Sequence, residues 1–176
     1  MAAGLRASLS AFDRRSPARL TEAEARFGNH PSYFDVLIDC LADEAPAVSA
    51  GASWLIRHSL ERGAEIDADG TSRLIGKLPQ VATWDGALHL LQSMRRLRLA
   101  PADIDKAAAW AMPHLDHERP FVRAWALDAL CALAEREPRL HANAARRLTA
   151  AAKDPAASVR ARARRLSMGP KRGKPA

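Results

Sequence analysis

Apolar side chains recur at helical spacing along most of this chain, and the clearest run is PFVRAWALDALCALA at residues 120–134. A proline opens this run, as is common in the first turn of a helix. Its apolar positions then share one helical face: Val122, Ala126, Ala129, Leu130 and Leu133. Runs of the residues that favour strands are absent, and alanine and leucine dominate. The pattern predicts an all-α protein.

Three valines give the length of a repeat. Val48, Val122 and Val159 lie 74 and 37 residues apart, so the repeating unit has 37 residues. Two places before this position, successive units carry Pro46, Thr83, Pro120 and Ala157, and two places after it they carry Ala50, Ala87, Ala124 and Ala161. Proline fits the first turn of a helix and threonine caps one. Two apolar helical runs in each unit of this length predict a solenoid of helix pairs.

Four helical hairpins follow from this repeat. Their first helices are expected at 31–43, 71–78, 101–116 and 138–153, and their second helices at 46–62, 83–97, 120–136 and 156–168. The units occupy about 31–63, 69–98, 101–137 and 138–168. Residues 1–30 are expected to form an amino-terminal helical cap, with a helix at ARLTEAEARF. Residues 169–176, GPKRGKPA, are expected to be a flexible basic tail because Gly, Pro and Lys cannot offset the entropy of ordering.

The last two units resemble a known family. Phe121-Val122-Arg123 and Ser158-Val159-Arg160, each followed by Ala and Leu at helical spacing, are similar to the second helix of a HEAT repeat. Asp154-Pro155 resembles the turn before that helix, and in the second unit Asp85-Gly86 replaces the Val-Arg pair. The likeness covers about residues 31–168. It implies a right-handed α-solenoid of about four HEAT-like hairpins with an extra N-terminal helix, an architecture that carries no function of its own.

Second helices line the concave face of a HEAT-like stack, and three of the four tryptophans fall in them. With Val122 toward the core and 100° per residue, Arg123 and Trp125 lie on opposite flanks of the core stripe, and Asp128 points toward the concave face. Tryptophan beside arginine suits recognition of acidic peptides or bases. The partner-binding face predicted on this basis consists of Trp54, His89, Arg123, Trp125 and Asp128.

Two of these assignments have a purely structural alternative. The tryptophans also fit as wedges between repeats, where they would belong to the core. Arg123 and Arg160 also fit an internal ladder of ion pairs, because the resemblance places this arginine near the Asp of a turn. Both alternatives stay open from the sequence.

The formal charge of +7 is unevenly distributed. Residues 139–176 hold 11 Lys and Arg and one acidic residue, whereas residues 1–138 hold 16 Lys and Arg and 19 Asp and Glu. The predicted basic patch lies on the last helix: Arg160, Arg162, Arg164 and Arg165. Such a patch suits phosphates or acidic side chains, or serves as the solubilising end of a repeat array.

Motifs for catalysis, cofactors or metals do not stand out. His114 and His117, three residues apart with carboxylates nearby, resemble part of a metal site, but they occupy the turn position where Asp43 and Asp154 stand in other units. A helix-capping turn is the preferred interpretation. We predict no catalytic, cofactor or metal residues. No run of 18 apolar residues exists, and the amino terminus lacks the apolar core of a secretory signal, so we expect no membrane contact and a cytoplasmic location.

Three functions remain as hypotheses. The first is a non-catalytic scaffold that binds a protein or peptide on its concave face. The second is nucleic-acid binding through the basic last unit. The third is an enzyme that resembles the HEAT-like alkylpurine DNA glycosylases, although the Trp-x-x-x-Asp pair of that family is missing: Trp54 and Trp110 are followed four residues later by histidine.

Overall fold

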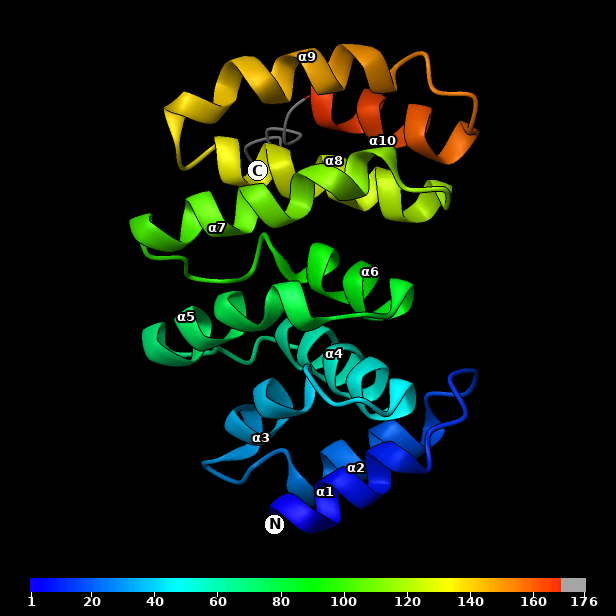
Figure 1. Ribbon diagram of the computed structural model, residues 1–176, viewed down its shortest axis with the longest axis vertical. Coiled ribbons are helices and arrows are strands. Elements are labelled where there is room, and N and C mark those ends of the chain that lie inside the picture. The colour runs from blue at the N-terminus through cyan, green and yellow to red at the C-terminus, as the bar shows by residue number, and fades with distance from the viewer. Residues whose placement is uncertain (169–176) are drawn as a thin grey trace, which may run out of the picture.

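The computed structural model describes residues 1–168, and within them the chain is all-helical, with ten α-helices and three short 3₁₀ helices (Figure 1). The α-helices are α1 (Ala2–Ser10), α2 (Ala18–Phe27), α3 (Tyr33–Cys40), α4 (Pro46–Glu61), α5 (Ala68–Lys77), α6 (Trp84–Ser93), α7 (Pro101–Ala111), α8 (Pro120–Ala134), α9 (His141–Ala151) and α10 (Ala157–Ser167). The 3₁₀ helices are η1 (Leu78–Gln80), η2 (Met112–Asp116) and η3 (Pro138–Leu140). The predicted tail at 169–176 lies outside the described residues.

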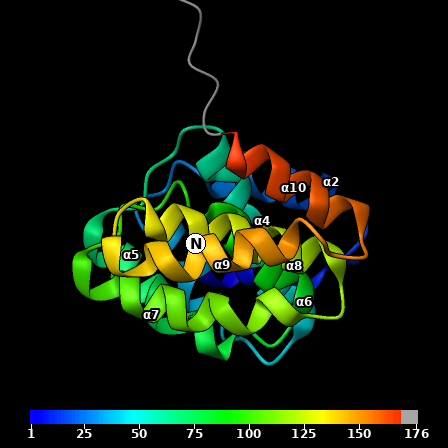
Figure 2. The same cartoon turned by 90° about the horizontal axis from the view of Figure 1, so that it is seen from above.

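Successive hairpins follow one another along the long axis of the molecule, from α1 and α2 at one end to α9 and α10 at the other (Figure 1). On one side α4 packs against α6, α6 against α8 and α8 against α10, while on the other α3 packs against α5 and α5 against α7. Seen along this axis, the last hairpin, α9 and α10, lies nearest the viewer, with the earlier helices behind it (Figure 2). Second helices therefore form a continuous layer.

Many polar contacts between hairpins join residues about one repeat apart, while that of Arg14 with Asp85 spans 71 positions. Arg6 and Asp43 are separated by 37 positions, Ser53 and His89 by 36, and Arg73 and Asp35 by 38. A chain whose units contact their immediate neighbours produces this spacing. The spacing agrees with the 37-residue period of the sequence.

The starts of the second helices are set by the residues that the sequence singled out. Pro46 and Pro120 each occupy the first turn of their helix, where a missing N–H costs nothing. Thr83 caps α6, and its hydroxyl accepts a hydrogen bond from the Gly86 N–H at 3.2 Å. A Cβ at Gly86 would lie only 2.7 Å from Thr83 Oγ1, so the capped turn requires glycine there.

Each predicted first helix differs from the observed one by three to five residues at one end, and two of these differences have a clear local cause. Helix α5 begins at Ala68, three residues earlier than expected, because the Asp67 carboxylate accepts the Gly70 N–H at 2.7 Å and caps the helix. Helix α7 ends at Ala111 rather than Asp116, and a 3₁₀ turn continues it, because Pro113 cannot donate the helical hydrogen bond.

The three valines that define the repeat belong to the core. Val48 and Val122 are fully buried and Val159 is 2% exposed. Each contributes about 1.5–3 kcal/mol by leaving water. The expectation that these three positions face the core is confirmed.

The amino terminus contains two helices where the sequence analysis predicted one. Helix α2 has the predicted bounds, but α1 was missed. Leu5 and Leu9 of α1 are fully buried against the rest of the core. Their approach to α4 is possible because residue 51 is glycine: a Cβ there would lie 3.0 Å from Leu9 Cδ2 and 3.3 Å from Leu20 Cδ2. Residues 1–30 thus pack on the first unit.

Within residues 1–168, every helix is too short or too polar to cross a bilayer.

Candidate functional site: a face of aromatic and charged side chains on the second helices

Side chains of α4, α6, α8 and α10, together with Arg95 just after α6, make contacts along the layer of second helices. We call this set the second-helix face: Trp54, Arg57, His58, His89, Arg95, Trp125, Asp128 and Arg162. It includes four of the five residues predicted for partner binding. The fifth, Arg123, lies elsewhere and is described below.

The first cluster of this face is on α4. The Trp54 ring stacks on the His58 ring, with centroids 4.5 Å apart and an interplanar angle of 18°. Their spacing of four residues puts both rings on one side of the helix. Arg57 covers Trp54 at 5.7 Å, and His58 Nε2 lies 3.3 Å from a carboxylate oxygen of Glu24 in α2. Trp54 is partly buried and packs on the core, so part of the structural alternative for the tryptophans holds here.

His89 of α6 joins this cluster through Ser53. The Ser53 hydroxyl donates to the Ala50 carbonyl at 2.8 Å and lies 3.1 Å from His89 Nδ1. Burial, aided by the Arg57 charge, lowers the pKa of His89 to about 4. His89 is therefore neutral at physiological pH.

The second cluster surrounds Asp128 in the middle of α8. Asp128 is 5% exposed, and its two carboxylate oxygens accept from Arg95 Nε at 2.7 Å and Arg162 Nη1 at 2.9 Å. The Arg162 guanidinium lies over the Trp125 ring at 3.7 Å, and Arg95 also binds Glu135. A buried carboxylate needs such partners, because an unpaired one costs several kcal/mol. The sequence-predicted pair Trp125 and Asp128 is thus brought together with Arg162 of the basic patch.

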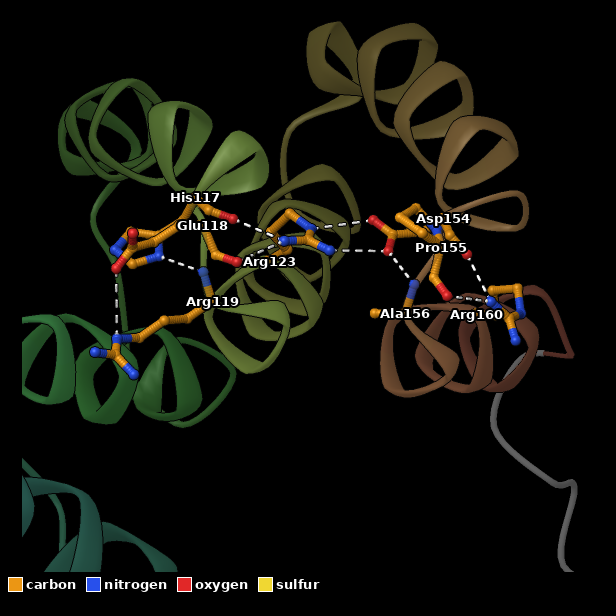
Figure 3. Close-up of polar contacts among 8 residues, drawn as sticks. All are labelled: His117, Glu118, Arg119, Arg123, Asp154, Pro155, Ala156 and Arg160. Atoms are coloured by element: carbon orange, nitrogen blue, oxygen red, sulfur yellow. Dashed lines mark hydrogen bonds and ion pairs between the residues drawn. The ribbon is translucent and has the colours of Figure 1, made fainter.

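Arg123 does not lie on the second-helix face, which corrects its assignment to one surface with Trp125 and Asp128. Its Nε and Nη2 donate to the two oxygens of Asp154 at 3.0 and 2.9 Å, and its Nη1 donates to the carbonyls of His117 and Glu118 (Figure 3). Its long side chain reaches the turn between α9 and α10. The Arg123 guanidinium holds the pKa of Asp154 below its usual range. Of the two ion pairs that the sequence left open, that of Arg123 is present, whereas Arg160 meets no carboxylate among residues 1–168.

The His114 and His117 pair serves the turn. His117 Nδ1 accepts the Arg119 N–H at 3.0 Å, in the same way that Asp43 accepts from Ala45 and Asp154 from Ala156. Among the described residues, His, Cys, Asp and Glu form no group of three that could hold a metal ion.

The four cations of the basic patch have different environments. Arg160 donates to the carbonyls of its own turn, and Arg162 binds Asp128. Arg164 and Arg165 are exposed and have no ionic partner among residues 1–168. Only half of the predicted patch therefore stands open to solvent.

Arg57 and Arg95 are members of the face that sequence reasoning missed. A usable signal was present, because Arg95 precedes Asp128 by 33 positions and Arg162 follows it by 34. A search for opposite charges about one repeat apart would have found both partners of Asp128.

An open hollow of about 590 Å³ lies between α1 and α2, lined by Ser8, Arg19, Glu22 and Arg26, and contains none of the predicted site residues.

Comparison of the chain with protein-family models, with curated proteins and with solved structures finds no match. The resemblance to HEAT repeats therefore rests on the chain's own residues and their arrangement.

Proposed function

We propose that this protein is a non-catalytic scaffold of HEAT-like repeats, a right-handed α-solenoid that binds a protein or peptide along its second-helix face. The layered packing of equivalent helices and the 37-residue period support the architecture. The function is supported by what the second-helix face presents. Tryptophan and arginine dominate the energetics of protein interfaces, and here they occur in paired contacts on one side.

The observation that carries the proposal is the state of Arg162. Its guanidinium is fixed by one hydrogen bond to Asp128 and by the Trp125 ring, and its other N–H groups make no hydrogen bond to the described residues. An arginine has five donors, so four remain for a ligand. Because Asp128 and Trp125 already hold the Arg162 side chain in place, binding of a partner there costs little additional side-chain entropy in this protein. An acidic or carbonyl-rich protein segment fits this donor set.

The same geometry weighs against the other two hypotheses. Nucleic-acid binding by the last helix has less net positive charge to use, because the Arg162 guanidinium is paired with the Asp128 carboxylate. A catalytic role for Asp128 would need an open carboxylate oxygen, and each oxygen already accepts from an arginine. Arg164 and Arg165 keep nucleic acid as an outcome that the experiment must distinguish.

A matched pair of tryptophans makes the test sharp. Trp54 stacks on His58 in the second-helix layer. In the other layer, Trp110 of α7 contacts His114 of η2 with the same four-residue spacing. A photoreactive amino acid at Gln92 of α6, with Lys106 of α7 as the control position, identifies the partner by mass spectrometry. Trp54→Leu should then weaken binding of that purified partner at least about tenfold, while Trp110→Leu changes it less than about twofold.

Equal effects of the two leucine variants would contradict the proposal, as would crosslinks that form equally from positions 92 and 106. If nuclease treatment abolishes the crosslinked species, and binding of a DNA duplex falls steeply with salt, the nucleic-acid hypothesis replaces it.

A further inference from the structure

The turns before α8 and α10 repeat one another in atomic detail (Figure 3). In the first, Arg123 Nη1 donates to the carbonyls of residues 117 and 118, at 2.9 and 3.1 Å. In the second, Arg160 Nη1 donates to the carbonyls of Asp154 and Pro155, both at 2.7 Å. Each acceptor lies 37 positions after its counterpart. The two guanidinium groups are thus held in the same way by their own turns.

The two copies differ in what the other edge of the guanidinium meets. The Nε and Nη2 edge of Arg123 chelates the carboxylate of Asp154, which belongs to the next turn. The same Asp154 oxygen that accepts from Nη2 also accepts the Ala156 N–H at 2.8 Å, so this carboxylate is oriented by the turn that leads into α10. The corresponding edge of Arg160 meets no carboxylate in the described part of the chain.

The surroundings of Arg160 set the charge of what can bind. Between residues 138 and 168 the chain has eight arginines and lysines, and Asp154 is the one acidic residue. Asp154 is already bound to Arg123. Arg164 and Arg165 on the same helix add exposed positive charge. A carboxylate that approaches this edge therefore meets an attractive field.

We propose that the Nε and Nη2 edge of Arg160 is a carboxylate-binding site at the end of the molecule, which takes an aspartate or glutamate side chain of an acidic protein partner. The occupied copy at Arg123 is its template: the guanidinium is already fixed by two carbonyls, and a planar carboxylate completes it with two parallel hydrogen bonds. The site lies at the turn and not on the second-helix face, so it goes beyond the function proposed above.

Titration of the full chain with a short oligoglutamate peptide tests the site. In NMR spectra the Nε–Hε signal of Arg160 should shift and saturate, while that of Arg123, whose edge is occupied, should stay unchanged. Arg160→Lys keeps the charge and removes the planar fork, and should weaken peptide binding about tenfold. Arg164→Lys is the matched control on the same helix and should change it less than about twofold.

Several outcomes would overturn the site. They are an unshifted Arg160 signal at saturating peptide, equal losses in the two lysine variants, or no binding by the wild-type chain. A DNA strand of equal charge forms the second arm: if it binds more tightly than oligoglutamate and loses affinity in Arg160→Lys, the site is one for phosphate. The NMR measurement on wild-type protein remains decisive if Arg160→Lys destabilises the turn. Failure here leaves the crosslinking test of the second-helix face unaffected.

Discussion

Arg123 and Arg162 both bind a carboxylate of a neighbouring unit, and their side chains are 15% and 16% exposed. Their remaining N–H groups have different hydrogen-bond partners. Arg123 uses four of its five N–H groups, two on Asp154 and two on backbone carbonyls. Arg162 makes one hydrogen bond within the described residues and rests on an aromatic ring. The two arginines are therefore similarly buried but differ in the number of N–H groups left to bind a ligand.

The difference follows from where each arginine leaves its helix. Arg123 and Arg160 lie in the first turn of a second helix, next to the carbonyls of the preceding turn, which supply acceptors wherever the fold repeats. Arg162 lies one half-turn further along, over the residue 125 position of the preceding unit, where a side chain and not the backbone decides what it meets. We call the first arrangement, Arg123 with Asp154 and the two turns, the turn ladder. Two backbone carbonyls therefore hold the guanidinium groups of Arg123 and Arg160, whereas side chains of the preceding unit hold that of Arg162.

The largest expected effect comes from breaking the turn ladder. Arg123→Met removes both bonds to Asp154 and leaves two turn carbonyls without their donor, so the free energy of unfolding should fall by about 3 kcal/mol. Arg162→Met should cost only about 1 kcal/mol, because Asp128 keeps Arg95. Urea unfolding followed by circular dichroism measures both, with the exposed Arg164→Met as control. A cost for Arg162→Met equal to that for Arg123→Met would remove the distinction between the two regions.

The positions of the helices could be predicted from the sequence more completely than the contacts of the long side chains. All eight helices of the four hairpins were predicted, with ends up to five residues away from those observed, because the proline column and the apolar period are local signals. Helix α1 was missed because Leu5 and Leu9 are its only buried residues. Its other positions are small residues and Arg6, which give no apolar pattern. Two leucines four positions apart fit many conformations, and only the proximity of α4 makes them a helical face.

The candidate site was predicted in part. Asp128 and Trp125 were identified from helical geometry, which fixes the direction of Cβ. The destination of a long side chain is not fixed by that direction, so the same geometry could not tell that Arg123 turns back to Asp154 whereas Arg162 reaches Asp128. Arg95 follows the end of α6 at Ser93, where the apolar period no longer applies. The sequence signal for its role is its separation of 33 positions from Asp128, not its place in the apolar period.

An intermediate effect is expected from pH at the second-helix face. Burial lowers the pKa of His89 from 6.5 to about 4. Between these values the unfolded chain binds a proton at residue 89 that the folded protein does not, so this residue lowers stability as the pH falls through the window. The contribution should be about 1.5 kcal/mol, less than the full shift implies because the ring keeps some contact with solvent.

His89→Gln removes this dependence and makes it measurable. The difference in unfolding free energy between wild type and His89→Gln should change by that amount between neutral pH and pH 4, with wild type losing more. His141→Gln, on the exposed first residue of α9, should leave the dependence unchanged. A constant difference between wild type and His89→Gln across this range would mean that His89 is protonated as readily in the folded protein as in the unfolded chain.

The smallest expected effect is a gain of stability in the turn before α8. His117 stands where Asp43 and Asp154 stand in other turns, and its Nδ1 accepts the Arg119 N–H at 3.0 Å. In the Asp43 turn the equivalent backbone bond lowers the pKa of the carboxyl, which shows that the turn favours a negative charge. His117→Asp should therefore raise the unfolding free energy, because a carboxylate is a stronger acceptor and also favours the positive end of the α8 dipole.

The gain should be only about 0.5 kcal/mol, because the arginine that completes the turn ladder elsewhere is missing here. Gly86 occupies the position of Arg123 in the second unit, and it cannot be replaced, since a Cβ there would meet Thr83 Oγ1 at 2.7 Å and Val81 Cγ1 at 2.9 Å. Thermal unfolding of His117→Asp beside His117→Asn separates charge from hydrogen bonding. If the asparagine variant gains as much stability as the aspartate variant, the gain comes from the short hydrogen-bond acceptor alone. The negative charge then contributes nothing without an arginine opposite it.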